Sequence, residues 1–64
     1  ILGNIKPNDK LIKKGETISR NKITYKGPAY GIYAKYEDIV LGQSALRDID
    51  ADVPITWDLI GNDL

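Results

Sequence analysis

Few residues in this chain can carry chemistry, because the commonest catalytic groups are missing. The 64 residues contain no Cys and no His. The usual thiol nucleophile, the commonest general base and the commonest transition-metal ligand are therefore absent. A disulfide framework and a thiolate zinc site are excluded for the same reason. We expect no catalytic activity and no cofactor in this chain taken alone.

Three alternating carboxylates, Asp48, Asp50 and Asp52, form the densest group of potential metal ligands. The pattern resembles the opening of a calcium loop, but Val53 and Leu59 stand where that loop needs Gly and a bidentate Glu. A strand explains the alternation more simply, with the intervening apolar residues facing the core and the carboxylates facing water. The sequence therefore predicts no metal site here.

Aromatic residues and lysines alternate in the middle of the chain. The four tyrosines are Tyr25, Tyr30, Tyr33 and Tyr36. Such a group can stack against a sugar ring or single-stranded nucleic acid, but zero net charge and only two Arg argue against nucleic acid. Alternatively, the rings fill a core that lacks Phe and Met, and we expect about half of them to be buried. A sugar-facing role for Tyr30 or Tyr33 stays open.

The strongest local signal is the segment 26–32. Pro28 fixes one backbone angle for a turn, and Gly27 and Gly31 permit angles or close approaches that a side chain would prevent. The segment is either a shaped connection or a rigid loop presented to a ligand. The candidate substrate-binding residues are Lys26, Gly27, Pro28, Tyr30 and Gly31.

Short strands and turns must position these residues, because apolar stretches are brief and broken by Gly and Pro. Residues 1–8 are rich in turn formers and are expected to be a lead-in, followed by one domain over 9–62. One or two helical turns are expected over 35–41, with Tyr36, Ile39 and Val40 on one side and Gly42 at the end. No stretch reads as a membrane span or signal peptide, so we expect a cytoplasmic location without membrane contact.

Charge is unevenly distributed along the chain. Residues 1–32 carry +5 and residues 33–64 carry −5. The two halves are expected to attract each other after folding, although the same dipole could orient the domain against a charged partner.

The two halves also share a spacing of apolar residues. At an offset of 37 positions, Ile12, Ile18 and Ile23 match Ile49, Ile55 and Ile60, and Ser19 matches Thr56. Each hydroxyl suits an N-cap that accepts hydrogen bonds from the N–H groups of a short helical turn. We therefore expect two interlocked copies around a pseudo-twofold axis. The predicted core comprises Ile12, Ile18, Ile23, Ile32, Ile39, Leu41, Ile49, Ile55 and Ile60.

Taken together, these residues and spacings resemble the SAF (antifreeze-like) domain of sialic acid synthases. The resemblance rests on Ile12-x-x-Gly15-Glu16-x-Ile18-Ser19, Pro28-x-x-Gly31-Ile32, Leu41-Gly42, Arg47-Asp48-Ile49, Pro54-Ile55 and Trp57-x-x-Ile60. It implies a compact, mainly β pretzel (a β-clip) with short 3-10 turns and internal pseudo-twofold symmetry. Fish type III antifreeze proteins belong to the same fold group.

The resemblance also implies a longer parent enzyme. An upstream TIM-barrel domain would condense phosphoenolpyruvate with an N-acetylated sugar to give sialic, legionaminic or pseudaminic acid, using manganese or magnesium bound in the barrel. The SAF domain of one subunit would close the barrel of its partner in a homodimer without doing chemistry itself. Gly27 stands where the family usually carries an Arg that reaches the sugar. Either Lys26 or Tyr30 replaces that contact, or the parent takes a different sugar, or the module has lost this role.

Two other functions stay open at this point. A free-standing ice-binding protein would use a flat face with small hydroxyls, for which the candidates are Thr17, Ser19 and Ser44. Arg20 and Lys22 would lie on the same face and oppose this role, because charged groups resist dehydration. SAF-like modules also bind protein partners in flagellar and pilus assembly, normally behind a signal peptide or membrane anchor.

Overall fold

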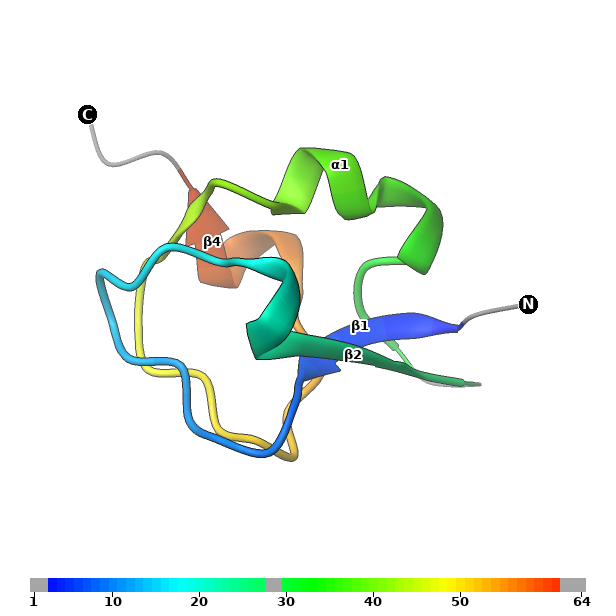
Figure 1. Cartoon of the computed structure of the whole chain (residues 1–64), viewed down its shortest axis with the longest axis horizontal. Coiled ribbons are helices and arrows are strands. Elements are labelled where there is room, and N and C mark those ends of the chain that lie inside the picture. Colours follow the sequence, from blue (N-terminus) through cyan, green and yellow to red (C-terminus); the bar gives the residue numbers. More distant parts are fainter. Residues whose placement is uncertain (1–2, 28–29, 62–64) are drawn as a thin grey trace.

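Two short antiparallel ladders frame the fold of the computed structural model, which describes residues 3–27 and 30–61 (Figure 1). In the first ladder β1 (Asn4–Pro7) pairs with β2 (Ile23–Lys26), in a register that sets Asn4 opposite Lys26 and Pro7 opposite Ile23. In the second, β3 (Ser44–Ala45) pairs with β4 (Ile60–Gly61). Long irregular segments join these strands, as the frequent Gly and Pro predict.

Four short helical elements complete the described part of the fold. They are the 3-10 turns η1 (Arg20–Lys22), η2 (Ala34–Tyr36) and η3 (Trp57–Leu59) and the helix α1 (Glu37–Val40). The predicted helical segment is confirmed by η2 and α1, and Gly42 follows with a φ of 93° that favours glycine. The predicted apolar side is only partly right: Val40 is fully buried, whereas Ile39 is 54% exposed.

The repeated spacing corresponds to repeated local structure. Ser19 precedes η1 and Thr56 precedes η3, both with extended backbones, and Ile23 and Ile60 follow. The predicted capping contacts are wrong, because neither hydroxyl accepts a hydrogen bond from its turn. Each hydroxyl instead donates to the carboxamide or carboxylate two residues further on.

Between the two copies, Ile12 and Ile49 exchange backbone hydrogen bonds of 2.9 and 2.7 Å. The halves therefore interlock at equivalent positions. The pseudo-twofold axis itself stays a prediction.

The core is built mainly from isoleucine. Seven of the nine predicted residues are buried, Leu41 is partly buried against them and Ile39 is outside the core. The buried cluster is Ile5, Ile12, Ile18, Ile23, Ile32, Val40, Ala45, Ile49, Ile55 and Ile60. Ile5 belongs to the segment expected to be a lead-in, so residues 4–7 are an integral strand of the fold rather than a linker.

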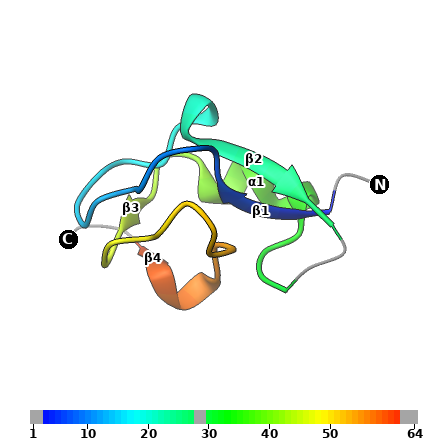
Figure 2. The ribbon, with the colours of Figure 1, turned by 90° about the horizontal axis from the view of Figure 1, so that it is seen from below.

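The aspartate-rich segment does not form the expected strand. Ile49 pairs with Ile12, but the chain turns immediately afterwards, where the N–H of Val53 donates to the carbonyl of Asp50 at 3.0 Å. Ile49 is buried as predicted, whereas Val53 is 37% exposed. Figure 2 shows this segment folding back beneath β1. Within the described part of the chain, no helix is long and apolar enough to cross a bilayer.

Candidate functional site

The segment 26–32 starts from a close contact between two glycines. Gly27 follows β2 and lies directly against Gly3, the residue before β1. A Cβ on Gly3 would lie 2.7 Å from the backbone N of Gly27, closer than side-chain atoms approach. Two side-chain-free residues are therefore needed where the loop leaves the ladder. Pro28, the next predicted residue, lies outside the described residues.

The far end of the loop is held by Gly31 and Asn4. Gly31 has a φ of +111°, and a Cβ there would lie 2.8 Å from the carbonyl oxygen of Ile55. The buried side-chain amide of Asn4 donates to the carbonyl oxygen of Gly31 at 3.0 Å. The N–H of Ile32 donates to the Ile55 carbonyl at 2.9 Å. Strand β1 therefore fixes both ends of this loop.

A shallow cleft of about 340 Å³ opens beside the loop. Its walls are Asn4, Lys6, Lys26, Tyr30, Asp52 and Pro54. The ladder register places Lys6 and Lys26 on one face of β1–β2, and the Tyr30 ring is 67% exposed. Two ammonium groups and an exposed ring can bind a hydroxylated or anionic ligand by hydrogen bonds and stacking. The structure thus brings together Lys26 and Tyr30 of the predicted set.

Sequence reasoning missed Asn4 and Lys6 because it treated residues 1–8 as a lead-in. A signal was present: Ile5 stands between two polar residues and before Pro7, as in a short half-buried strand. Such a strand places Asn4 and Lys6 together on the face opposite Ile5.

The tyrosines are more exposed than expected. Tyr25 packs partly buried against the core, whereas Tyr33 is 60% exposed and Tyr36 is 37% exposed. Tyr36 meets Trp57 edge to face, with ring centroids 6.0 Å apart, and the ammonium of Lys35 lies 5.2 Å from the centroid of the Tyr36 ring. These rings form a surface pair away from the cleft, not a core.

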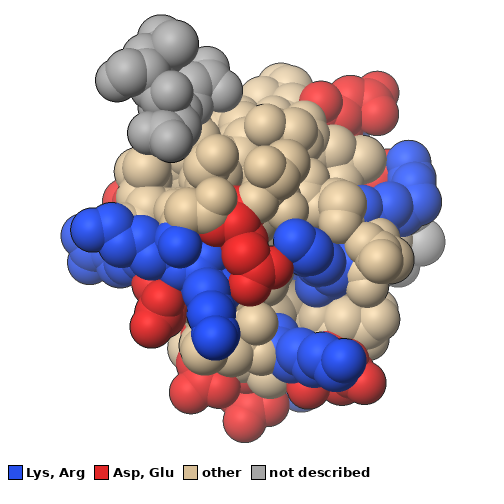
Figure 3. Space-filling model, turned by 60° about the vertical axis from the view of Figure 1, so that its left-hand side comes forward, with Lys and Arg blue, Asp and Glu red and all other residues tan. Residues whose placement is uncertain are grey.

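The candidate ice-binding hydroxyls lie close to charged groups. Thr17 and Ser44 face each other across an isolated bridge, and Ser19 stands before η1. The ammonium of Lys22 donates to the Thr17 carbonyl at 3.0 Å and lies 2.7 Å from the carboxylate of Glu16. Figure 3 shows basic and acidic side chains interspersed on the side of the molecule that carries the loops between β1 and η1.

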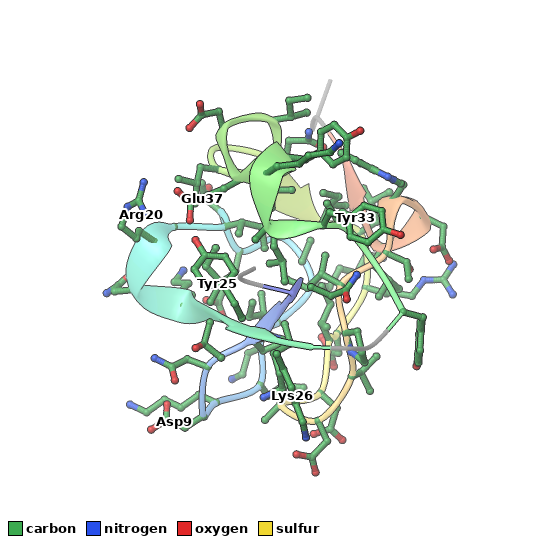
Figure 4. All side chains as sticks on the ribbon, turned by 90° about the vertical axis from the view of Figure 1, so that its right-hand side faces the viewer. Asp9, Arg20, Tyr25, Lys26, Tyr33 and Glu37 are labelled. Atoms are coloured by element: carbon green, nitrogen blue, oxygen red, sulfur yellow. The ribbon has the colours of Figure 1, made fainter. Side chains whose placement is uncertain are left out.

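Two ion pairs define the electrostatics near these hydroxyls. The hydrogen bond from Lys22 holds the pKa of Glu16 below its ordinary value of 4.5. The guanidinium of Arg20 lies 2.6 Å from the carboxylate of Glu37 and so joins the basic half of the chain to the acidic half (Figure 4). These charged groups are strongly hydrated, so this surface lacks the weakly hydrated face that ice binding requires.

The aspartate series has a structural role in part. The carboxylate of Asp48 accepts a hydrogen bond of 2.8 Å from the backbone N–H of Lys14, which fastens one loop to the other. Among residues 3–27 and 30–61, no three acidic side chains gather as a metal ion would require.

A protein-family model, described as the SAF domain, matches residues 9–61 of this chain. The chain belongs to the SAF domain family. A curated relative, an uncharacterized protein of Methanocaldococcus jannaschii, is 42% identical to this SAF domain over 52 residues. That match covers 80% of the chain but 15% of the relative, so the SAF domain spans a small part of that protein's length.

The fold of this SAF domain is also found in a solved structure. It matches an antifreeze protein-like domain in human N-acetylneuraminic acid phosphate synthase with a TM-score of 0.86 and 21% identity. The match covers 97% of this chain and 78% of the human one. The expected compact, mainly β fold with short 3-10 turns is confirmed.

Proposed function

We propose that this SAF domain closes the active site of a nonulosonic acid synthase over its N-acetylated sugar substrate. The observation that carries the proposal is the fold match, over 97% of the chain, to an antifreeze-like domain found in a sialic acid phosphate synthase. The parent would combine this module with a barrel domain that condenses phosphoenolpyruvate with the sugar, and the module would cover the barrel of the partner subunit. Its contribution is to exclude water and position the sugar, as a lid does.

The cleft beside segment 26–32 is the edge that faces the sugar in this proposal. Gly27 has no side chain to provide the Arg contact that the family resemblance implies. Lys26 precedes Gly27 and is exposed, and Tyr30 lines the same cleft with its side chain largely in solvent. An ammonium and an aromatic ring at these places supply a hydrogen-bond donor and a stacking surface for the sugar.

Kinetics of the parent polypeptide carrying Lys26→Ala or Tyr30→Ala test this role. Loss of one substrate contact should raise the KM for the sugar by about 5-fold to 30-fold, the effect of 1–2 kcal/mol. The KM for phosphoenolpyruvate should stay unchanged, because its site lies in the barrel. Lys13→Ala and Tyr33→Ala are matched controls, since both side chains are exposed and neither lines the cleft. Unchanged sugar kinetics in both cleft variants would show that the cleft does not contact the sugar.

Ice binding has no comparable support. The three hydroxyls proposed for it share their surface with the ion pairs of Lys22 and Arg20. We therefore put forward a single function.

A further inference from the structure

The outer edge of β2 presents backbone groups that β1 does not use. The N–H of Ile5 donates to the carbonyl of Ile32 at 2.8 Å, and its carbonyl accepts from the N–H of Ile55 at 2.9 Å. Both polar groups of Ile5 thus point away from its partner Tyr25. In an antiparallel ladder such a pair is the non-hydrogen-bonded kind, and the N–H and carbonyl of Tyr25 must point away from β1 as well.

Within the described part of the chain, no other backbone group pairs with this edge at Tyr25. Figure 2 shows β2 near the upper edge of the molecule, with β1 beneath it. The edge begins after Ile23, whose N–H donates to the carbonyl of Arg20 in η1. An edge strand with an outward N–H and carbonyl is a template for adding another strand.

The side chains along β2 indicate what kind of strand would bind. Thr24 and Lys26 project to the face that also carries Lys6, whereas Tyr25 projects to the other face (Figure 4). Among the described residues, no carboxylate forms an ion pair with Lys6 or Lys26, in contrast to Lys22 and Arg20. Asp52 is the one acidic side chain in the cleft beside them. The edge is therefore basic and complements acidic side chains.

We propose that the outer edge of β2 binds an acidic peptide segment in extended conformation, which adds a third strand to the β1–β2 ladder. One peptide residue exchanges hydrogen bonds with the N–H and carbonyl of Tyr25. Its two neighbours project to the face of Thr24 and Lys26, where carboxylates meet the lysines. A second copy of this chain is a poorer occupant, because it would bring another Lys26 to an already basic edge.

Titration of the ¹⁵N-labelled 64-residue chain with a blocked hexapeptide of alternating Glu and Thr tests this inference. Amide shifts should concentrate at residues 23–27, and the Tyr25 N–H should exchange rapidly in the free chain and slowly in the complex. Lys26→Glu should weaken binding about 5-fold or more, since it replaces an attraction with a repulsion. Lys13→Glu carries the same charge change away from the edge and should weaken binding less than about 2-fold.

Two further peptides separate strand addition from non-specific attraction. A hexapeptide of alternating Lys and Thr should not bind, and neither should the acidic peptide with Pro at its centre, because Pro removes the N–H that pairs with Tyr25. Equal binding of the proline peptide, or a Tyr25 amide that the acidic peptide leaves unprotected, would overturn the proposal. Edge shifts that appear with protein concentration alone would assign the edge to a second copy of the chain and would also overturn it. These measurements need no enzyme activity, so they are independent of the proposed function.

Discussion

Gly31 meets two constraints that a side chain could not meet together. Its φ of +111° is unfavourable for L-residues, and a Cβ would lie only 2.8 Å from the carbonyl oxygen of Ile55. Gly15 also has a positive φ, of +90°, but open space surrounds its Cβ position. A comparison of substitutions at Gly15 and Gly31 therefore distinguishes the cost of backbone strain from the cost of steric overlap.

We predict that Gly31→Ala destabilises the domain more than Gly15→Ala does. Gly15→Ala should cost about 1–2 kcal/mol, the strain of a left-handed backbone alone. Gly31→Ala adds an overlap that must displace the Ile55 backbone, and its cost should exceed this by about 1 kcal/mol or more. Urea unfolding of both variants measures the difference. Equal urea midpoints for the two variants would mean that the Ile55 backbone moves away from a Cβ at position 31 without measurable cost.

Glu16 gives a prediction about charge at the same scale. Its pKa is lowered from 4.5 chiefly by the hydrogen bond from Lys22. Because the folded pKa is the lower one, the stability that this pair contributes is present above pH 4.5 and is lost as the pH falls through the folded pKa. Lys22→Gln should return the Glu16 pKa toward its ordinary value in a carbon-detected NMR titration. Lys26→Gln is the control and should leave the Glu16 pKa unchanged. If Lys22→Gln also left it unchanged, the ion pair between Glu16 and Lys22 would not form in solution.

At the scale of the elements, isoleucines at equivalent places in the two halves hold the ladders together. Ile18 and Ile55 are 1% and 0% exposed. Ile18→Ala and Ile55→Ala should each cost about 2–5 kcal/mol, enough to unfold a domain of this size at room temperature. Ile39→Ala should change the melting temperature little, because Ile39 is 54% exposed and Ala is a good helix former. Wild-type-like melting of both core variants would refute this account of the core.

The elements marked by a local sequence pattern were the ones that could be predicted. The equivalent isoleucines and the turns after Ser19 and Thr56 follow from spacing alone, and so does the short helix before Gly42. Contacts between distant segments could not be predicted in this way. Ile39 and Val40 have similar hydrophobicity, and only the packing of α1 against the core decides which one is buried.

The candidate site was predictable on one side only. Segment 26–32 could be recognised from Gly27, Pro28 and Gly31, since glycine and proline have strong backbone preferences. The loop is supported by Asn4, which pairs with Lys26, 22 positions further along the chain. The composition of residues 1–8 indicated a linker, so this support was not predicted. The capping prediction failed for a local reason: the hydroxyls of Ser19 and Thr56 donate to the side chains of Asn21 and Asp58, which orients them toward these side chains and not toward the N–H groups of the turns.

At the scale of the whole molecule, the distribution of charge opposes ice binding by this chain. Arg20 and Lys22 form ion pairs beside the hydroxyls of the candidate ice-binding face. We predict no ice shaping by this chain at millimolar concentration. Replacing Arg20 and Lys22 with Ala should move the face toward ice binding, because the strongly hydrated groups are gone. Faceted ice crystals grown with the unmodified chain would contradict the prediction.

The central claim is that this domain closes a synthase active site over a sugar. The most direct test compares the parent polypeptide with the same polypeptide lacking the SAF domain together with its first strand, residues 4–61. Condensation of phosphoenolpyruvate with N-acetylated sugars would be measured for both. The claim predicts a loss of about tenfold or more in kcat/KM for the sugar, with the KM for phosphoenolpyruvate nearly unchanged. Equal sugar kinetics with and without the domain, or no condensation by the intact polypeptide, would contradict it.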